Sequence, residues 1–367
     1  MEIIEVDQKH LSAFIEFPDK LYSDDGNYVP YMKADLKKTL KKLLFEDRSY
    51  SALIATEQGE TKARILFTLD KNKQLKTDKC GFFSMFECVD DQTVCNAILD
   101  KTIEILKSKN AEYISGTYFP FDQDNRRGIL VQGFDRAPLI FTSYNKPYYD
   151  RLLTEYGLIK QVDALEYTVD IHSANYERLA KISEYSQKRF DFHVDKVDWK
   201  KLERDIRDVQ SIMQCATTDI IYQDAPDIEA LQNIVKQWKK YLFDDYILIA
   251  RKNDDNTPLG VVVALPDFFQ VFKKMNGKTD LKGLIAFARE KKRIKSARAI
   301  MQYVLPEYQK CGVAVALYNQ MGKALNRHNV EYLELGTMME DNVAPNSAMT
   351  AIGGKVARVY RIYEKKI

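Results

Sequence analysis

The sequence predicts an α/β protein with two tandem domains, each with a central mixed sheet flanked by helices. Three observations lead to this prediction. The length of 367 residues suggests two domains. A weak repeat of helices, hairpin, strand, helix and strand occurs in both halves. The stretch from Arg298 to Ala324 joins a strand, a loop of small residues and a helix. We expect domains at 1–170 and 191–367, joined by a polar helical connector at 171–190.

Composition narrows the function classes. The chain is 45% hydrophobic and 29% charged, with a formal net charge of +2, which gives no reason to expect a nucleic-acid partner. No run approaches the roughly 18 apolar residues of a membrane span, and the first residues do not resemble a signal peptide. We therefore expect a cytoplasmic protein without a nucleic-acid or membrane partner. Oligomeric state is left open.

Cysteine and histidine spacing argues against a disulfide framework and a metal site. The five cysteines include no Cys-x-x-Cys pair, and the four histidines lie far apart along the chain. We expect reduced thiols and no bound metal.

The first half reads as a series of strands and helices. Expected strands are Met1–Val6, Tyr50–Thr56, Ala63–Asp70, Gly81–Cys88, Glu112–Tyr118 and Lys160–Asp170, and expected helices are His10–Leu21, Tyr31–Leu44 and Gln92–Ser108. The segment from Asp122 to Tyr149 has little periodicity but many glycines, prolines and aromatics, so we interpret it as a long functional loop.

The second half repeats this order. Expected strands are Asp191–Val197, Tyr246–Arg251, Leu259–Leu265, Ala299–Leu305, Glu331–Met338 and Val356–Glu364, and expected helices are Trp199–Ala216, Asp227–Leu242, Val313–Asn326 and Ala344–Ile352. A helical, lysine-rich insertion, Asp267–Lys295, interrupts the order. Its apolar positions predict packing on the core or the other domain, and contact with a membrane surface is the alternative.

The loop before the last long helix suits an anionic ligand. Pro306 ends the strand, and the residues from Gln309 to Ala314 open the helix. A helix N-terminus offers unpaired N–H groups and a partial positive charge, and small residues let a phosphate come close. An ordinary strand-to-helix turn, with Gly312 there for packing, is the alternative.

This Gln-x-x-Gly-x-Ala motif resembles the acyl-CoA loop of the GNAT-type N-acyltransferases. The resemblance implies acetyl-CoA or another acyl-CoA as co-substrate, with backbone groups of Tyr303, Val304 and Leu305 on the pantetheine arm. It also implies that the pyrophosphate lies on the loop and that Asn342 meets the CoA arm. The implied loop residues are Gln309, Lys310, Cys311, Gly312, Val313 and Ala314.

Three further signatures are similar to a little-characterised group of bacterial double-GNAT proteins. They are Gly-x-Leu-Val-x-Gly-Phe-Asp-x-x-Pro from Gly128, Tyr-Asn-x-Pro-Tyr-Tyr from Tyr144, and Tyr156-Gly157-Leu158. This resemblance covers nearly the whole chain and implies an acyl-CoA-linked activity. We interpret Tyr144, Tyr148 and Tyr149 either as acceptor-site lining or as packing between the domains.

The first domain lacks the phosphate loop. Its corresponding segment, Val89-Asp90-Asp91-Gln92, places two acids where a phosphate would lie. We expect this domain to be a degenerate GNAT-like scaffold or a wall of the acceptor site.

Catalytic candidates come from the second domain. Glu334 could be the base that accepts the amine proton, and a solvated or salt-bridged carboxylate is the alternative. The family's thiolate-protonating tyrosine is absent from Ala344–Ile352. Tyr360 and Tyr363 are possible substitutes, or aromatic core residues. We read Cys311 as a small filler residue.

The favoured function is an N-acyltransferase that moves an acyl group from acyl-CoA to a small-molecule or amino-acid-like amine. Two alternatives keep the fold. One is an inactive acyl-CoA-binding sensor or scaffold, favoured by the missing tyrosine. The other is a ligase that uses aminoacyl-tRNA, against which the near-neutral charge and the intact loop argue.

Overall fold

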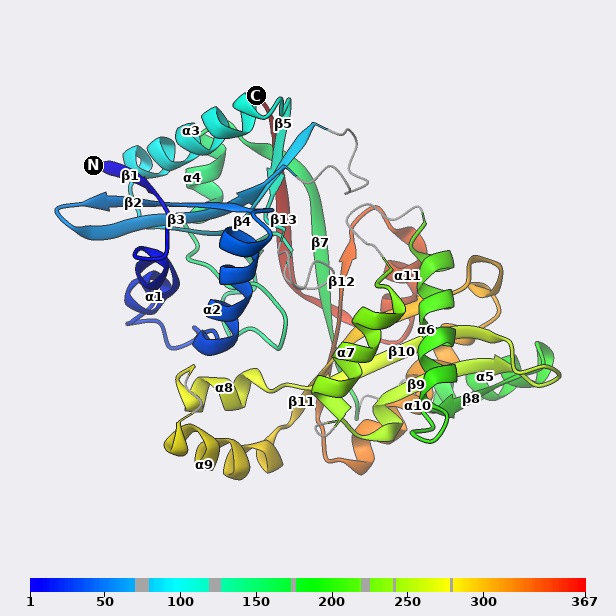
Figure 1. Ribbon diagram of the computed structural model, residues 1–367. Helices are drawn as coiled ribbons and strands as arrows, with labels where there is room; N and C mark the ends of the chain where they lie inside the picture. The colour runs from blue at the N-terminus through cyan, green and yellow to red at the C-terminus, as the bar shows by residue number, and fades with distance from the viewer. Residues whose placement is uncertain (70–78, 119–126, 173–175, 219–224, 240–241, 278–279) are drawn as a thin grey trace. The chain divides into compact units, whose positions relative to one another are not determined.

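The computed structural model describes the chain except residues 70–78, 119–126, 173–175, 219–224, 240–241 and 278–279. The chain forms two compact units (Figure 1). Unit 1 comprises Met1–Leu165, Phe269–Lys292 and Arg358–Ile367, and unit 2 comprises Glu166–Phe268 and Arg293–Ala357. The start of the long loop predicted from Asp122 lies outside the described residues.

Unit 1 is a sheet with helices on both faces. Its strands are β1 (Glu2–Glu5), β2 (Ser51–Glu57), β3 (Glu60–Thr68), β4 (Cys80–Cys88), β5 (Tyr113–Gly116) and β6 (Ile129–Gln132). Its helices are α1 (Leu11–Leu21), α2 (Lys33–Lys41), α3 (Gln92–Ser108), α4 (Tyr149–Glu155), α8 (Phe269–Met275) and α9 (Leu281–Glu290). Strand β7 (Ile159–Asp170) begins in this unit and ends in unit 2.

Helices cover both faces of this sheet, and the side chains that alternate along each strand pack against one set of helices or the other. Leu53 and Ala55 of β2 pack with α3, while Ala52 and Ile54 pack with α1 and α2. Figure 1 shows α3 on one side of β2 to β4, and α1 and α2 on the other. A strand buried on both faces needs a continuous apolar run, which these sequences provide.

Unit 2 contains the remaining elements. Its helices are α5 (Tyr176–Arg189), α6 (Leu202–Ala216), α7 (Ile228–Trp238), α10 (Val313–Arg327) and α11 (Val343–Ala351). Its strands are β8 (Phe192–Lys196), β9 (Ile247–Lys252), β10 (Pro258–Pro266), β11 (Ser296–Val304) and β12 (Tyr332–Met339), adjacent in the order β12-β11-β10-β9-β8. Strand β13 (Lys355–Lys366) starts here and continues into unit 1.

The two units share one element order, which confirms the repeat predicted from the sequence. The series β1, α1, α2, β2, β3, β4, α3, β5 in unit 1 corresponds to β8, α6, α7, β9, β10, β11, α10, β12 in unit 2. In each unit the last two strands of the series pair in parallel over four residues, Cys80–Phe83 with Tyr113–Gly116 and Ser296–Ala299 with Tyr332–Leu335. A Gly-Thr dipeptide lies where each pairing ends, at Gly116-Thr117 and Gly336-Thr337.

The unit boundaries differ from the predicted domains at several places. Residues Phe269–Lys292 of the insertion, expected within the second domain, belong to unit 1, and the end of β7 belongs to unit 2. Helix α5, expected to be a connector, belongs to unit 2, where it packs on α10. The end of β13 belongs to unit 1 because it pairs there with β5 and β6. Strand β6 itself lies in the segment that we interpreted as a loop, because four residues of partnered strand are too few to show a period.

The predicted tyrosine cluster is held inside unit 1. The Tyr149 hydroxyl donates to Glu87 Oε2 at 2.8 Å and accepts from the Cys88 amide, and the Tyr148 hydroxyl donates to the Cys88 carbonyl oxygen. The Tyr144 hydroxyl donates to Asp25. Each hydroxyl is therefore engaged by a group of its own unit.

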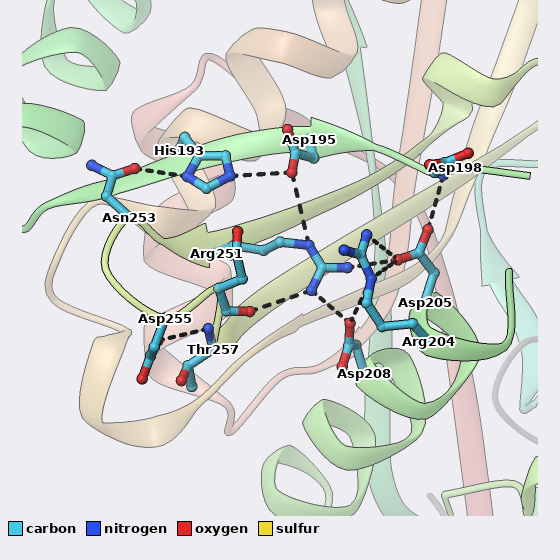
Figure 2. A network of polar contacts seen from close by, with 11 residues as sticks. His193, Asp195, Asp198, Arg204, Asp205, Asp208, Arg251, Asn253, Asp255 and Thr257 are labelled. Carbon is cyan, nitrogen blue, oxygen red and sulfur yellow. Dashed lines mark hydrogen bonds and ion pairs between the residues drawn. The ribbon is translucent and has the colours of Figure 1, made fainter. Parts of the chain in front are cut away.

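A buried ion-pair network fixes α6 to β9 (Figure 2). Arg251 of β9 is 1% exposed and donates to Asp205 at 2.8 Å and Asp208 at 2.5 Å, both on α6. Asp205 also accepts from Arg204 and from the Asp198 amide. On β8, Asp195 bonds the His193 ring, whose other nitrogen meets Asn253. The network anchors the N-terminal half of α6 on β9, and the other end of this helix, at Cys215 and Ala216, borders the pocket described below.

Candidate functional site

The site begins where two neighbouring strands of unit 2 separate. Pairing between β11 and β12 ends at Ala299 and Leu335, but β11 continues to Val304 and β12 to Met339. Backbone groups on the facing edges of the separated strands are then available to a ligand instead of a neighbouring strand.

The helix that follows β11 starts without a side-chain cap. Gly312 is the N-cap of α10, with φ of +74°, and since glycine has no side chain it makes no capping hydrogen bond to the first-turn amides. A β-carbon on Gly312 would lie 2.1 Å from Ser186 Oγ, so glycine is required for both the backbone conformation and the packing on α5. The first turn of α10 keeps amide groups and a positive dipole end available for an anion.

The equivalent helix of unit 1 is capped. Asp91 precedes α3, and its carboxylate accepts from the Thr93 and Val94 amides at 2.7 and 3.4 Å. The neighbouring Asp90 pairs with Arg151. The first turn of α3 is therefore already partnered by a carboxylate, whose negative charge would repel a phosphate at this place.

A pocket of about 310 Å³ lies between the separated strand β11 and the helices α10, α11 and α6 of unit 2. The small or aliphatic side chains of Ala314, Leu317, Ala344 and Ala348 form much of its wall. Its full lining is Cys215, Ala216, Val261, Val262, Gln302, Tyr303, Val304, Pro306, Gln309, Ala314, Leu317, Tyr318, Asn342, Ala344, Pro345 and Ala348. An apolar wall with a few polar groups is typical of a small-molecule site.

A tyrosine that the sequence analysis did not single out lines this pocket. The Tyr318 hydroxyl donates to Gln302 Oε1 at 2.8 Å, which links α10 to β11. Burial raises the pKa of Tyr318, so the hydroxyl stays protonated and remains a hydrogen-bond donor. The signal was available in the sequence, since Tyr318 follows Ala314 of the loop motif by four residues and thus shares its helix face.

Five of the predicted CoA-binding residues line the pocket: Tyr303, Val304, Gln309, Ala314 and Asn342. The other five lie in the same loop or strand but outside the lining. Val313 is fully buried beside Gly260 of β10, and Cys311 is partly exposed, with its amide bonded to the Tyr308 carbonyl oxygen. Lys310 is exposed.

The backbone of β11 points alternately to its two neighbours. The Leu305 amide, expected to meet the pantetheine, donates to the Leu259 carbonyl oxygen of β10 at 2.9 Å. The Tyr303 carbonyl oxygen also lies against β10, at Gly260. Since successive residues of a strand direct their backbone groups to opposite sides, Gln302 and Val304 are the residues whose backbone faces away from β10.

The turn from β12 into α11 is held by one asparagine. Asn346 Nδ2 donates to the Met339 and Asn342 carbonyl oxygens, each at 2.8 Å, and Asn346 Oδ1 accepts from the Tyr167 hydroxyl at 3.0 Å. These bonds fix Asn342 at the pocket edge and orient the α11 residues that line it.

The predicted catalytic residues lie outside the pocket lining. Glu334 is 1% exposed, and the strand register places it opposite Arg298, whose guanidinium donates to the Gly336 carbonyl oxygen at 2.6 Å. Tyr360 is 1% exposed and belongs to unit 1, where it is the register partner of Leu130 in β6. Tyr363 is also buried in unit 1 and donates to Asp150.

The described residues contain neither a candidate membrane-spanning helix nor a cluster of metal-ligating side chains. Within the described residues, no helix combines the length and apolar character needed to cross a bilayer. Among those same residues, no group of three or more His, Cys, Asp or Glu side chains is placed to hold a metal ion.

Sequence comparison finds distant relatives that match this chain along nearly its whole length. No family model matches the chain. Protein YghO of Escherichia coli is 25% identical over 373 residues, which cover 99% of this chain and 94% of that protein. A bacterial ceramide synthase of Caulobacter vibrioides is 23% identical over 385 residues, covering 97% of this chain and 95% of that protein.

Solved structures with lower sequence identity share the fold of this chain. A tandem GNAT protein from the clavulanic acid biosynthesis pathway superposes with a TM-score of 0.55 at 11% identity, covering 100% of this chain and 98% of that one. The GCN5-related glucosamine N-acetyltransferase region of a fungal multi-domain β-N-acetylglucosaminidase gives a TM-score of 0.60 at 13% identity. It covers 99% of this chain, which spans only 38% of the fungal protein. The predicted fold of two tandem GNAT-like domains is confirmed.

Proposed function

We propose that this tandem GNAT-fold protein is an N-acyltransferase that binds acyl-CoA in the unit 2 pocket and transfers the acyl group to a primary amine. One observation carries the proposal. The uncapped start of α10 and the separated edge of β11 meet at a pocket whose lining includes Gln309 and Ala314 of the loop motif. A pyrophosphate matches the helix amides, and an amide-rich pantetheine arm matches the separated strand edge.

The transfer needs few protein groups. A neutral amine nitrogen attacks the thioester carbonyl carbon, the C–S bond breaks and an amide forms. The nitrogen gives up one proton and the leaving thiolate takes one up. We assign the Val304 amide, directed away from β10, as the donor to the developing oxyanion.

The residue that protonates the leaving thiolate is a different tyrosine in the structure-based proposal than in the sequence-based expectation. We propose the Tyr318 hydroxyl, because it lies in the pocket lining and stays protonated. The earlier candidate, Tyr360, lies in unit 1. Glu334 remains our proposed base. Because it is buried beside Arg298 and does not line the pocket, we propose that the amine proton reaches it through water.

The acceptor class follows from a relative, not from the pocket. A ceramide is an N-acylated long-chain amino alcohol, and a bacterial ceramide synthase is similar to this chain over 97% of its length. We therefore place long-chain amino alcohols beside small amines and amino acids as candidate acceptors. A cytoplasmic location, suggested by the sequence, is part of the same proposal.

Release of free CoA thiol tests the proposal. The purified protein is mixed with acetyl-CoA or a longer acyl-CoA and a panel of short amines, amino acids and long-chain amino alcohols. Amine-dependent thiol release, with the amide identified by mass spectrometry, supports the enzyme. Tight acyl-CoA binding without turnover of any amine would instead support the sensor or scaffold.

A further inference from the structure

Helix α9 presents an apolar surface to solvent. Leu281, Leu284 and Ile285 are 74%, 55% and 60% exposed, and Ala288 is exposed as well. Their spacing of i, i+3, i+4 and i+7 places all four on one helix face. A contiguous group of large exposed apolar side chains marks an interaction surface, whereas single exposed ones are ordinary.

The neighbouring helix explains how α9 is held. Phe269, Val271 and Met275 of α8 are buried. The turn after α8 is anchored where the Lys33 amide donates to the Gly277 carbonyl oxygen at 3.3 Å. We expected the apolar positions of the insertion to pack on the core or on the other domain. Helix α8 packs within unit 1, whereas the apolar face of α9 is exposed.

Within α9 itself, glycine is the buried residue. Gly283 is buried, so the smallest side chain of this helix lies on the packed side while the leucines and the isoleucine project outward. The Asp280 carboxylate caps the helix by accepting from the Gly283 amide at 2.8 Å. The apolar face is thus presented by an ordered, capped helix.

Basic side chains flank this apolar face. Lys282, Arg289, Lys291 and Lys292 are exposed, and the one acid among residues 281–292, Glu290, pairs with Arg289 at 3.2 Å. Lysine stems bury well against apolar surfaces while their ammonium groups reach outward. An apolar stripe bordered by excess positive charge complements a surface that is apolar inside and anionic at its boundary.

We propose that α9 docks the protein onto an anionic phospholipid bilayer, with Leu281, Leu284 and Ile285 at the headgroup boundary and the basic residues on lipid phosphates. We favour a bilayer over a protein partner because an anionic bilayer offers both an apolar interior for the apolar face and phosphate groups for the basic border. In this proposal α9 lies on the membrane surface, which replaces the expectation from composition that the protein has no membrane partner. This docking is independent of acyl transfer, so either proposal can fail without the other.

Vesicle co-sedimentation tests the docking. The full chain, without acyl-CoA, is centrifuged with phosphatidylcholine vesicles that contain or lack phosphatidylglycerol. The test variants are Leu281→Ser/Leu284→Ser/Ile285→Ser and Lys282→Gln/Lys291→Gln/Lys292→Gln. The control is Ile159→Ser, because Ile159 of unit 1 is 62% exposed, close to the 60% of Ile285. Thermal melts establish that every variant is folded.

We expect the wild type and Ile159→Ser to sediment with the phosphatidylglycerol vesicles. The serine triple variant is expected to bind at least about tenfold more weakly, and the glutamine triple variant to lose binding to a similar extent. Failure of the wild type to bind anionic vesicles would overturn the proposal. Equal binding by the serine variant would also overturn it, since α9 would then serve another partner such as a protein.

Discussion

The Tyr318 hydroxyl donates a hydrogen bond to Gln302 Oε1 at 2.8 Å, and both residues line the pocket of unit 2. This pair joins helix α10 to the strand that separates from β12. In the proposed reaction, the protonated hydroxyl donates to the leaving thiolate of acyl-CoA.

We expect Tyr318→Phe to lower kcat by about 10²-fold, the usual contribution of a general acid, while acyl-CoA affinity changes little. Steady-state kinetics and calorimetry separate the two effects. Tyr332→Phe is the control, because Tyr332 of β12 is 48% exposed and does not line the pocket. Since burial raises the pKa of Tyr318, its own titration should not appear in a rate profile around neutral pH. A Tyr318→Phe variant with full kcat would remove this residue from the mechanism.

Gly312→Ala should lower the free energy of unfolding by about 2 kcal/mol, because alanine disfavours a positive φ and its β-carbon would meet Ser186 Oγ. Urea denaturation measures the change. Gly26→Ala is the matched control, since nothing lies within 4 Å of its β-carbon position, and we expect a change below about 1 kcal/mol. Equal stability of the two variants would contradict the packing of α10 on α5.

Arg251→Met should lower the free energy of unfolding by about 3–5 kcal/mol, because it leaves the buried Asp205 carboxylate without its buried partner. Arg204→Met removes another partner of Asp205, but the Arg204 side chain is 42% exposed, so we expect a loss below about 1 kcal/mol. Chemical denaturation of both variants provides the comparison. Similar losses would show that burial does not decide the strength of these ion pairs.

The buried Glu87 carboxyl of unit 1 makes stability depend on pH. Burial raises the pKa of Glu87, although Arg64, Tyr22 and Tyr149 oppose this effect. A carboxyl with a raised pKa in the folded state stabilises the fold most below its unfolded pKa, and this contribution is lost as pH rises through the folded pKa. Glu87→Gln should therefore become more stable relative to wild type as pH is raised from acid to neutral. Urea denaturation at several pH values tests this, and a constant difference between the two proteins would contradict it.

Local patterns were sufficient to predict the parts of the fold that depend on neighbouring residues. The helix Gln92–Ser108 matches α3, and the helix from Val313 matches α10, because each starts at a recognisable capping or loop motif and carries a clear apolar face. The two acids before Gln92 led to the expectation that unit 1 has no phosphate site, which stays a prediction; the structure shows that the Asp91 carboxylate caps α3.

Long-range pairing set the features that the sequence did not reveal. Strand β6 forms because β13 returns to pair with it, and no local signal encodes a partner more than 200 residues away. The exposed face of α9 has the same apolar spacing as a packed helix, so periodicity alone cannot tell them apart. In the site, Tyr318 shares a helix face with the loop residue Ala314 one turn earlier, and the apolar spacing that predicts α10 does not indicate that this face lines a pocket.

Calorimetric titration of acetyl-CoA and a longer acyl-CoA tests the central claim, a single acyl-CoA site in unit 2. Ala314→Glu is the blocking variant, because Ala314 lines the pocket in the first turn of α10 and a glutamate there would add both bulk and negative charge beside the first-turn amides. Gln320→Glu adds the same charge to α10 outside the pocket lining and is the control. We predict binding by the wild type and the control and at least a roughly hundredfold loss in Ala314→Glu. Wild-type protein that binds neither acyl-CoA, or an Ala314→Glu variant that binds as well as the control, would contradict the account.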